Sequence, residues 1–433
     1  MSLRKIVILV FVTLVVSAGM VWSSGEAESS AGEAEEAEIQ FSISPREVGK
    51  VIPQFIEEFE AQNPNISVDW QQVPGVPNEQ HTLYVTKMAS QASQPDVLAL
   101  DVIWPGEFIA NGWAEPLNRF YEEGFFDQFL PGMMNSVTKD GDVYGVPLYT
   151  NAIHLFYRTD LLEEYGLDVP RTWSELEAAA NTVLEGENDQ DLNGYISMWA
   201  QIEGLFMNYL QFLWGAGGGF FDEQGNVNID TPEASRALQT MVDFTESGLA
   251  PESILTYRPN DAMALFRQGR AVFMVVQDFV WPMLNADDSP VAGNVGMTRV
   301  PYFEGNSDAN TVAMGGWILT MNPYSENKEA AAEFMKFITQ EQNALTMAVE
   351  TGSMPARKDM RDKEELFDSY PIAEQLYADF AVGNVRPSAQ AGAKYPELSH
   401  IMQSEVHAAL TGTKSVDAAL ESAQSRLEEL FAE

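Results

Sequence analysis

The sequence predicts an α/β protein whose chain passes between two lobes, and three observations support this. Strand-like and helix-like segments alternate over residues 39–101, which is typical of an open sheet with parallel strands. Residues 144–160 contain an apolar run, rich in β-branched and aromatic side chains, that indicates a buried strand. The 433 residues are enough for two or three domains.

The first part of the chain predicts one rim of such a sheet. Its strands and helices are expected at residues 39–43, 51–59, 66–70, 79–91 and 96–100. In open α/β sheets, ligands bind beyond the carboxyl ends of the strands. The loops that follow the three strands, 44–47, 73–81 and 101–104, are therefore expected to lie on one rim.

The central run carries polar groups at Tyr149, Thr150, Asn151 and His154. A buried strand must satisfy such groups with protein partners or with a ligand. We interpret the run as a strand that leaves one lobe, crosses a cleft and enters the second lobe. The alternative is an ordinary core strand whose polar groups are satisfied within the protein.

The second part of the chain predicts further helices and strands. Thr172 and Glu175 form a capping box, which places the start of a helix there. Residues 271–276 and 314–319 are expected to be strands, the latter containing paired glycines. The C-terminal part is expected to be helical. Its helices are predicted at residues 366–380, 399–410 and 416–431.

The charge and the N-terminus predict an exported protein. The net charge of −40 argues against nucleic acid or anionic membranes as partners, because both need a cationic footprint. Arg4 and Lys5, an apolar run over residues 6–16 and small residues after it predict a signal peptide at residues 1–18. An uncleaved anchor is the alternative.

The segment after the signal peptide predicts a tether. From Ser23 to Glu38 the chain holds Ser, Gly, Ala and Glu only, so residues 19–38 are expected to be a disordered acidic linker, with folded structure starting near Ile39. The sequence contains no cysteine, so no disulfide is expected and the usual acceptor for bacterial lipid attachment is absent. These features predict a protein free in the periplasm.

A series of short motifs runs through the chain in a specific order. They are Phe59-Glu60 with Asn63-Pro64, Pro95-Asp96-Val97, Asp101 to Trp104, Gly145-Val146-Pro147, Phe156 to Leu162, Pro170 with Thr172-Trp173 and Glu175-Leu176, Phe266 with Gly269, Asn285 to Val291, Gly315-Gly316-Trp317, and Arg386-Pro387. Together they resemble the extracellular solute-binding proteins of bacterial ABC sugar importers, sugar-binding family 1. The trehalose/maltose-binding branch is the most similar. The resemblance covers about residues 39–430.

The resemblance implies a type II periplasmic-binding-protein fold. In this fold two α/β lobes, each a mostly parallel sheet flanked by helices, are joined by hinge crossings, with the ligand between the lobes. The crossings are expected near residues 150–153, 296–299 and 337–340. The N-terminal lobe is expected at 39–150 plus 299–337, and the C-terminal lobe at 153–296 plus 340–433.

The resemblance also implies a function. The protein is expected to bind a di- or oligosaccharide, to deliver it to an ABC permease, to act as a monomer, and to have neither catalysis nor a cofactor. The rival hypothesis is an exported glycoside hydrolase that uses two carboxylates, and a structural scaffold is a third. An enzyme consumes its sugar, whereas a binding protein returns the sugar intact.

Sugar binding requires planar hydrogen-bonding groups for hydroxyls and aromatic platforms for the apolar faces of pyranose rings. Asp101, at the end of a strand, is expected to bind hydroxyls, with a helix-cap role as its alternative. Trp317 is expected to be a ring platform, with a plain core position as its alternative. The full set of expected ligand-binding residues is Glu47, His81, Asp101, Tyr149, Asn151, Gln277, Phe279, Gly316, Trp317 and Arg386.

Two of these positions depart from the branch. The branch has a carboxylate where Asn151 stands and a tryptophan where Gln277 stands. These two positions are therefore where we expect specificity to differ from that of trehalose- and maltose-binding relatives.

One acidic segment resembles the start of a calcium-binding loop. Asp189, Asp191 and Asn193 with Gly194 match the start of such a loop, but its twelfth position is Ala200 instead of Glu. A surface turn is the favoured interpretation, and no other metal site is expected.

Overall fold

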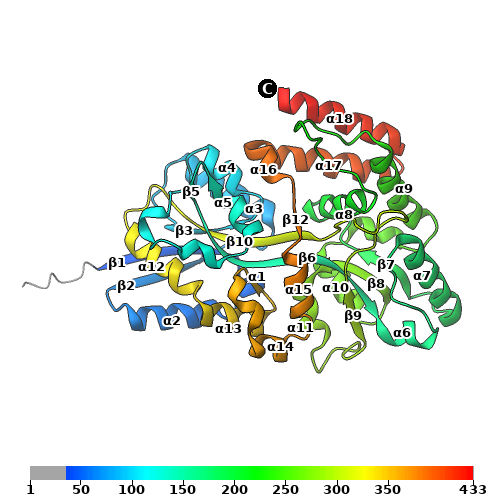
Figure 1. Cartoon of the computed structure of the whole chain (residues 1–433), viewed down its shortest axis with the longest axis horizontal. Coiled ribbons are helices and arrows are strands. Elements are labelled where there is room, and N and C mark those ends of the chain that lie inside the picture. Colours follow the sequence, from blue (N-terminus) through cyan, green and yellow to red (C-terminus); the bar gives the residue numbers. More distant parts are fainter. Residues whose placement is uncertain (1–35, 433) are drawn as a thin grey trace, which may run out of the picture. The chain divides into compact units, whose positions relative to one another are not determined.

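The computed structural model describes residues 36–432, which form one compact unit (Figure 1). The predicted signal peptide, residues 1–18, lies outside the described residues, as does the predicted linker up to residue 35. The first strand, β1, spans Ala37–Ile43, so it begins two residues before the predicted start at Ile39.

Most strands belong to one ten-stranded sheet, in the order β2-β1-β3-β10-β6-β8-β7. In that order, their bounds are Ile66–Gln72, Ala37–Ile43, Val97–Asp101, Ala313–Met321, Val146–Arg158, Ala271–Gln277 and Asn193–Ser197. Three short strands attach to its middle: β9 (Val295–Thr298) and β11 (Met354–Pro355) on β6, and β12 (Asn384–Val385) on β10. A separate hairpin pairs β4 (Thr138–Lys139) with β5 (Asp142–Val143).

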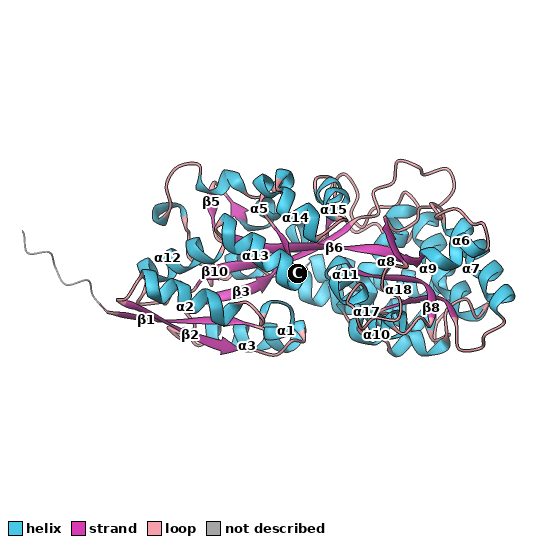
Figure 2. Cartoon of the chain, turned by 90° about the horizontal axis from the view of Figure 1, so that it is seen from below, coloured by secondary structure: helices cyan, strands magenta, loops and turns pink. Residues whose placement is uncertain are grey.

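Strand β6 confirms the predicted central strand. Its first eleven residues are all buried. It pairs with β10 over residues 146–153 and with β8 from Ile153 to Tyr157. Figure 2 shows β6 running from the half that contains β1, β2 and β3 to the half that contains β8. The chain therefore passes between two halves of the molecule within one strand.

The α/β class is confirmed, but the sheet is mixed instead of mostly parallel. Strands β1, β2 and β3 pair in parallel at one end, and β7 pairs in parallel with β8 at the other. Strands β6 and β10 run antiparallel to each other, β3 lies antiparallel to β10, and β8 lies antiparallel to β6. Only β6 pairs with strands of both halves, because its first part pairs with β10 and its last part with β8 and β9.

Helices cover the sheet of the first half (Figure 1). They are α1 (Pro45–Val48), α2 (Ile52–Gln62), α3 (Pro77–Ala89), α4 (Pro105–Ala110), α5 (Pro131–Val137), α12 (Lys328–Ile338) and α13 (Glu341–Thr351). Proline in the first turn starts α1, α2, α3, α4 and α5, because it lacks the N–H that a first turn leaves unbonded. Phe334 of α12 packs edge-on against Phe41 of β1 and Phe59 of α2, with ring centroids 5.1 and 5.2 Å away.

The second half contains more helices than the first. They are α6 (Thr159–Glu164), α7 (Trp173–Glu187), α8 (Glu203–Gly215), α9 (Pro232–Glu246), α10 (Pro259–Arg267), α11 (Trp281–Leu284), α14 (Glu364–Ser369), α15 (Ala373–Phe380), α16 (Ser388–Ala391), α17 (Tyr395–Leu410) and α18 (Val416–Ala432). The predicted capping box at Thr172 and Glu175 is confirmed at the start of α7. Trp173 then stacks on Phe212 of α8 at 3.8 Å between centroids.

Short 3-10 turns complete the described elements. They are η1 (Asn118–Phe120), η2 (Phe125–Gln128), η3 (Glu252–Thr256), η4 (Asp278–Val280), η5 (Lys358–Asp362) and η6 (Gly392–Lys394). The prediction of a single helix over residues 366–380 is wrong. Two helices, α14 and α15, flank Pro371, which cannot donate the backbone hydrogen bond of a helix interior.

The predicted boundaries of the two lobes remain a prediction. Several elements of residues 340–433 contact earlier parts of the chain, and these contacts are relevant to the boundaries. Helix α13 contacts α12 and α1, β12 pairs with β10, and α16 contacts α4. The prediction places α13, β12 and α16 in the C-terminal lobe, but all three touch elements of the predicted N-terminal lobe.

Candidate ligand-binding cavity

A cavity of about 340 Å³ lies where the two halves meet. All three predicted rim loops contribute to it, through Arg46 and Glu47 after β1, residues 75–78 after β2, and Asp101 at the end of β3. The middle of the sheet contributes Asn151 of β6 and residues 315–317 of β10. The remaining lining residues come from the second half and from Arg386. They are Met198, Ile202, Glu203, Gly204, Met207, Arg258, Pro259, Asn260, Gln277 and Phe279.

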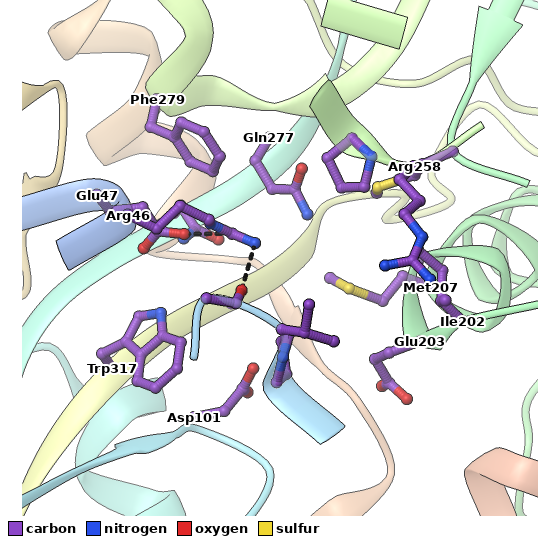
Figure 3. A pocket seen from close by; sticks show the side chains of 18 of the residues that line it. Arg46, Glu47, Asp101, Ile202, Glu203, Met207, Arg258, Gln277, Phe279 and Trp317 are labelled. Atoms are coloured by element: carbon purple, nitrogen blue, oxygen red, sulfur yellow. Dashed lines mark hydrogen bonds and ion pairs between the residues drawn. The ribbon is translucent and has the colours of Figure 1, made fainter. Parts of the chain in front are cut away.

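Two aromatic rings face the cavity from different elements. Trp317 is on β10 and is 8% exposed, and its ring packs edge-on against Trp104 at 5.8 Å. Phe279 is on η4 and is partly buried. Figure 3 shows Trp317, Arg46 and Glu47 on one side, across the cavity from Arg258, Met207 and Ile202.

The glycine before Trp317 allows a close approach of two strands. Gly316 has φ +147°, and a Cβ there would lie 2.6 Å from the Tyr149 carbonyl oxygen. A side chain at this position would push β10 away from β6 and move Trp317. The paired glycines therefore set the position of the ring.

The Glu47 carboxylate is held from two sides. It forms an ion pair with Arg46 and accepts a hydrogen bond from the Tyr149 hydroxyl. Arg46 also donates to the Gly75 carbonyl at 3.1 Å. Tyr149 is buried beneath Glu47, and burial, together with the Glu47 charge, raises the pKa of the phenol well above its usual range. The phenol therefore stays a hydrogen-bond donor to Glu47.

A buried arginine connects the two halves across the cavity. Arg386 is 3% exposed, and it donates to Asp101 Oδ1 at 2.7 Å and to Glu203 Oε1 at 2.9 Å. Burial raises the pKa of the Asp101 carboxyl, and the Arg386 guanidinium partly offsets this. Glu203 also accepts hydrogen bonds from the hydroxyls of Tyr395, at 2.5 Å, and Ser399. This bridge joins the end of β3 to the start of α8.

The lining is polar but electrically balanced. Its charged side chains are three arginines and three carboxylates: Arg46, Arg258 and Arg386 with Glu47, Asp101 and Glu203. Uncharged amides, including Asn151 and Gln277, add hydrogen-bonding groups. Gln277 Oε1 is buried and has no hydrogen-bond partner among the described residues. The cavity therefore suits a neutral ligand with many hydroxyl groups.

The structure brings most of the predicted site residues together. Glu47, Asp101, Asn151, Gln277, Phe279, Gly316, Trp317 and Arg386 line the cavity. Tyr149 does not line it, because its side chain lies beneath Glu47. His81 does not line it either, because it lies on α3 with Nε2 2.5 Å from Glu107 Oε2. His81 faces a smaller cavity of about 160 Å³ that shares Asn78 and Glu203 with the first.

Several lining residues were not predicted from the sequence. Asn78 and Arg46 both lie in loops that the sequence predicts to be on the rim. These loops could therefore have identified them as candidate lining residues. Glu203, Met207 and Arg258 belong to the starts of α8 and α10, which no local pattern connects to the rim. Only the packing of the two halves brings them to the cavity.

The calcium alternative at residues 189–194 finds no support. Asp191 forms an ion pair with Arg270 at 2.7 Å, and the Asn193 side-chain amide donates to the Arg270 carbonyl. Residues 36–432 contain no cluster of three or more His, Cys, Asp or Glu side chains suited to a metal ion. The segment is a surface turn that continues into β7.

The fold and the cavity define a class of protein. Two α/β halves share the continuous strand β6 and enclose a cavity lined from both sides, which is the architecture of a type II periplasmic binding protein. The chain belongs to the bacterial extracellular solute-binding protein family, whose model matches residues 43–345. Members of this family bind solutes and are not enzymes. Membership implies that the chain acts outside the cytoplasm.

Individual relatives agree with this assignment. A probable ABC transporter-binding protein of Deinococcus radiodurans is 29% identical over 360 residues, covering 82% of this chain and 84% of the relative. The structure of maltose-bound MalE3 from T. maritima is 36% identical, with a TM-score of 0.85, and covers 91% of this chain and 100% of that one. A solute-binding protein of Thermotoga lettingae bound with α-D-tagatose is 25% identical, with a TM-score of 0.80, and covers 92% of this chain and 100% of that one.

Within residues 36–432, no helix combines the length and the apolar character that crossing a bilayer requires.

Proposed function

We propose that this protein is the periplasmic binding component of an ABC sugar importer and binds a di- or oligosaccharide in the cavity. The observation that carries the proposal is the lining: aromatic rings at Trp317 and Phe279 accompany charge-balanced hydrogen-bonding groups. Pyranose rings present C–H groups to aromatic faces and hydroxyls to planar polar groups. The similarity to a maltose-bound relative supports this ligand class.

The charge balance favours a neutral sugar over a charged one. A phosphorylated or acidic ligand would add negative charge to a cavity whose three carboxylates already balance its three arginines. Two of those arginines, Arg46 and Arg386, are already paired with carboxylates. Arg46 and Arg386 are therefore not free to bind an anionic ligand.

The size of the cavity favours a ligand larger than a few atoms. Pockets for drug-sized ligands measure roughly 300–1,000 Å³, and the cavity of about 340 Å³ falls at the lower end. A disaccharide is the ligand we expect to fit best. Asn151 and Gln277, where the resemblance implies a carboxylate and a tryptophan, are the positions at which we expect the choice of disaccharide to be made.

The proposal also covers export of the protein, closure on the sugar and delivery of the sugar. We propose that a cleavable signal peptide exports the chain, that the monomer closes on its sugar, and that it delivers the sugar to a permease. The continuous strand β6 supplies one connection about which the two halves would move. Glu203 and Asp101, joined through Arg386, supply a contact that holds the closed form.

The experiment is thermal unfolding of residues 19–433 against a panel of mono-, di- and oligosaccharides and polyols, with recovery of the sugar. A ligand at 100 times its Kd adds about 2.7 kcal/mol to the stability of the native state. We expect a disaccharide to raise the midpoint and to be recovered unchanged.

Controls separate cleft binding from unspecific effects. Glu47→Gln should weaken the shift, whereas Glu350→Gln, in an exposed pair with Lys50, should leave it intact. Consumption of the sugar would instead indicate an enzyme. Stabilisation by monosaccharides or polyols alone would remove the disaccharide from the proposal, and no shift with any member of the panel would overturn the sugar ligand.

A further inference from the structure

A second, smaller cavity lies beside the candidate ligand-binding cavity. It measures about 160 Å³ and shares Asn78 and Glu203 with the main cavity. Asn78 belongs to α3 in the first half of the molecule, and Glu203 starts α8 in the second half. These two side chains therefore flank the junction between the two cavities.

Both halves of the molecule line the smaller cavity, as they line the main one. From the first half, His81 and Thr82 of α3 and Trp104 at the start of α4 contribute. From the second half, Ser399 and Gln403 of α17 contribute. A ligand in the smaller cavity would therefore contact both halves, which is also true of a ligand in the main cavity.

The aromatic wall of the main cavity extends into the smaller one. Trp104 lines the smaller cavity and meets Trp317 of the main cavity edge-on, with ring centroids 5.8 Å apart. The His81 ring also packs against Trp104, with 5.3 Å between centroids. Aromatic side chains offer apolar surface to the C–H groups of a pyranose. The smaller cavity thus offers a sugar the same kind of surface as the main cavity does.

A buried amide in the smaller cavity has an acceptor that the protein does not use. Gln403 is 5% exposed, and its Nε2 donates to Ser399 Oγ at 2.8 Å. Ser399 donates its own hydrogen to Glu203, so it can only accept from Gln403, and this fixes the orientation of the amide. Among residues 36–432, no group donates a hydrogen bond to Gln403 Oε1. Since buried polar groups are normally hydrogen-bonded, this oxygen is available to a hydroxyl of a ligand.

His81 supplies a second acceptor. Its Nε2 lies 2.5 Å from Glu107 Oε2. An ionised carboxylate can only accept, so Nε2 carries the hydrogen between these two atoms. In the neutral ring, Nδ1 then has a free lone pair, and no donor within the described part of the chain is bonded to it. The contact with Glu107 therefore orients the ring and leaves Nδ1 for a ligand.

The volume and the charge of the smaller cavity suit one neutral sugar ring. We expect the main cavity of about 340 Å³ to hold the two rings of a disaccharide, and the smaller cavity has about half of that volume. The Glu203 carboxylate at the junction is already paired with Arg386 and accepts a hydrogen bond from Tyr395. Its charge is therefore not free to select a cationic ligand.

We propose that the smaller cavity is a further subsite of the cleft, which binds the third ring of an oligosaccharide whose first two rings occupy the main cavity. The glycosidic linkage passes between Asn78 and Glu203. Gln403 Oε1 and His81 Nδ1 accept hydrogen bonds from hydroxyls of the third ring. The inference rests on the proposed sugar-binding function and extends it from a disaccharide to a trisaccharide.

The test is titration calorimetry with three pairs of sugars that differ by one ring: maltose and maltotriose, cellobiose and cellotriose, and sucrose and raffinose. One hydrogen bond changes Kd by about fivefold. In at least one pair, the trisaccharide should therefore bind at least about fivefold more tightly than the disaccharide. Disaccharide binding without any such advantage would overturn the subsite and leave the proposed function intact. If none of the six sugars binds, the subsite is rejected, and the wider sugar panel decides the proposed function separately.

Thr82→Phe tests the subsite by filling it. Thr82 is exposed, lines the smaller cavity and not the main one, and donates its hydroxyl to the Asn78 carbonyl within α3 at 2.9 Å. The variant should abolish the trisaccharide advantage and leave the affinity for the disaccharide unchanged. Thr86→Phe is the matched control and should bind both sugars as the wild type does. Thr86 is also exposed, makes the same type of bond to the Thr82 carbonyl at 2.7 Å, and lines neither cavity. A trisaccharide advantage that survives in Thr82→Phe would overturn the subsite.

Gln403→Met tests the hydrogen bond to the third ring. Methionine has a similar length and lacks the amide oxygen, so the trisaccharide should lose about fivefold in Kd while the disaccharide keeps its affinity. An equal loss for both sugars would overturn the assignment, because the effect would then act through Glu203 on the main cavity. If Gln403→Met does not fold, the exposed Thr82→Phe variant still decides the inference.

Discussion

The two walls of the cavity are built in different ways. The wall from the first half is fixed: Glu47 is bonded to Arg46 and Tyr149, and Trp317 sits in a buried strand behind a glycine with no room for a side chain. The wall from the second half presents Met198, Ile202 and Met207 beside the exposed Arg258. Methionine is unbranched and adapts to irregular shapes.

The two walls are therefore expected to have different roles in ligand recognition. A pre-bonded wall holds one sugar ring in a single orientation at low entropic cost, because its side chains are already ordered. A wall of methionine and exposed arginine adjusts to what extends beyond that ring. Substitutions on the first wall should therefore reduce affinity for every ligand, whereas those on the second should change the ranking of ligands.

The largest expected effect comes from the residue that joins the two walls. Arg386→Met leaves Asp101 and Glu203 buried without their shared partner, and breaking a buried ion pair from one side costs about 3–5 kcal/mol. Denaturant unfolding measures the loss. The control, Arg270→Met, removes an exposed pair with Asp191 and should cost at most about 1 kcal/mol. Equal losses in both variants would show that the bridge stabilises the fold no more than an exposed ion pair does.

Trp317→Leu should come next, with an effect on binding. Loss of the ring platform should cost at least about 2 kcal/mol of binding free energy for every ligand of the panel. Titration calorimetry gives the values. Trp113→Leu, outside the cavity against Phe108, is the control and should bind as the wild type does. Retained affinity in Trp317→Leu would remove the first wall from the recognition of sugar.

Tyr149→Phe tests whether pre-bonding of Glu47 matters. The variant removes one hydroxyl that donates to Glu47, and such a hydrogen bond contributes about 1 kcal/mol. We expect a similar loss of affinity for all ligands, measured in the same way. Tyr377→Phe removes a buried hydroxyl that donates to the Pro355 carbonyl, away from the lining, and should leave affinity unchanged. If both variants bind alike, Glu47 does not depend on Tyr149.

Met207→Leu is the smallest change and addresses the second wall. It nearly conserves volume, so the stability change should stay below about 1.5 kcal/mol. Affinity for the best ligand should change little, but affinities for longer or branched sugars should drop because leucine adapts less well. The panel of sugars measures the ranking, and Met241→Leu in the core of α9 is the control. A uniform loss across the panel would contradict the adaptive wall.

The difference between the two walls also explains which parts of the cavity could be predicted from the sequence. The first wall follows from local rules: alternating strands and helices place the loops after β1, β2 and β3 on one rim, and paired glycines mark Trp317. His81 also lies near that rim, but nothing local showed that its ring turns toward Glu107 on α4.

The second wall depends on contacts between distant segments. Glu203 and Arg258 start two helices, and their sequence neighbourhoods resemble those of any helix start. Their position in the cavity becomes evident only from the packing of the two halves. The same is true of the return of residues 340–433 to the first half. The buried position of Asp278 could not be read from the sequence either, because its neighbour His154, with Nδ1 3.9 Å from Asp278 Oδ2, lies on β6, 124 residues earlier in the chain.

The order of strands in the sheet has a consequence for how the chain matures. Strand β10, at Ala313–Met321, lies between β3 and β6, which precede it in the sequence by many residues. The first half therefore cannot complete its sheet until that late strand has been synthesised, and such long-range pairing is slow to form. An incomplete sheet keeps the emerging chain loose during synthesis. That delay suits a protein that has to cross a membrane before it folds, as the proposed export route requires.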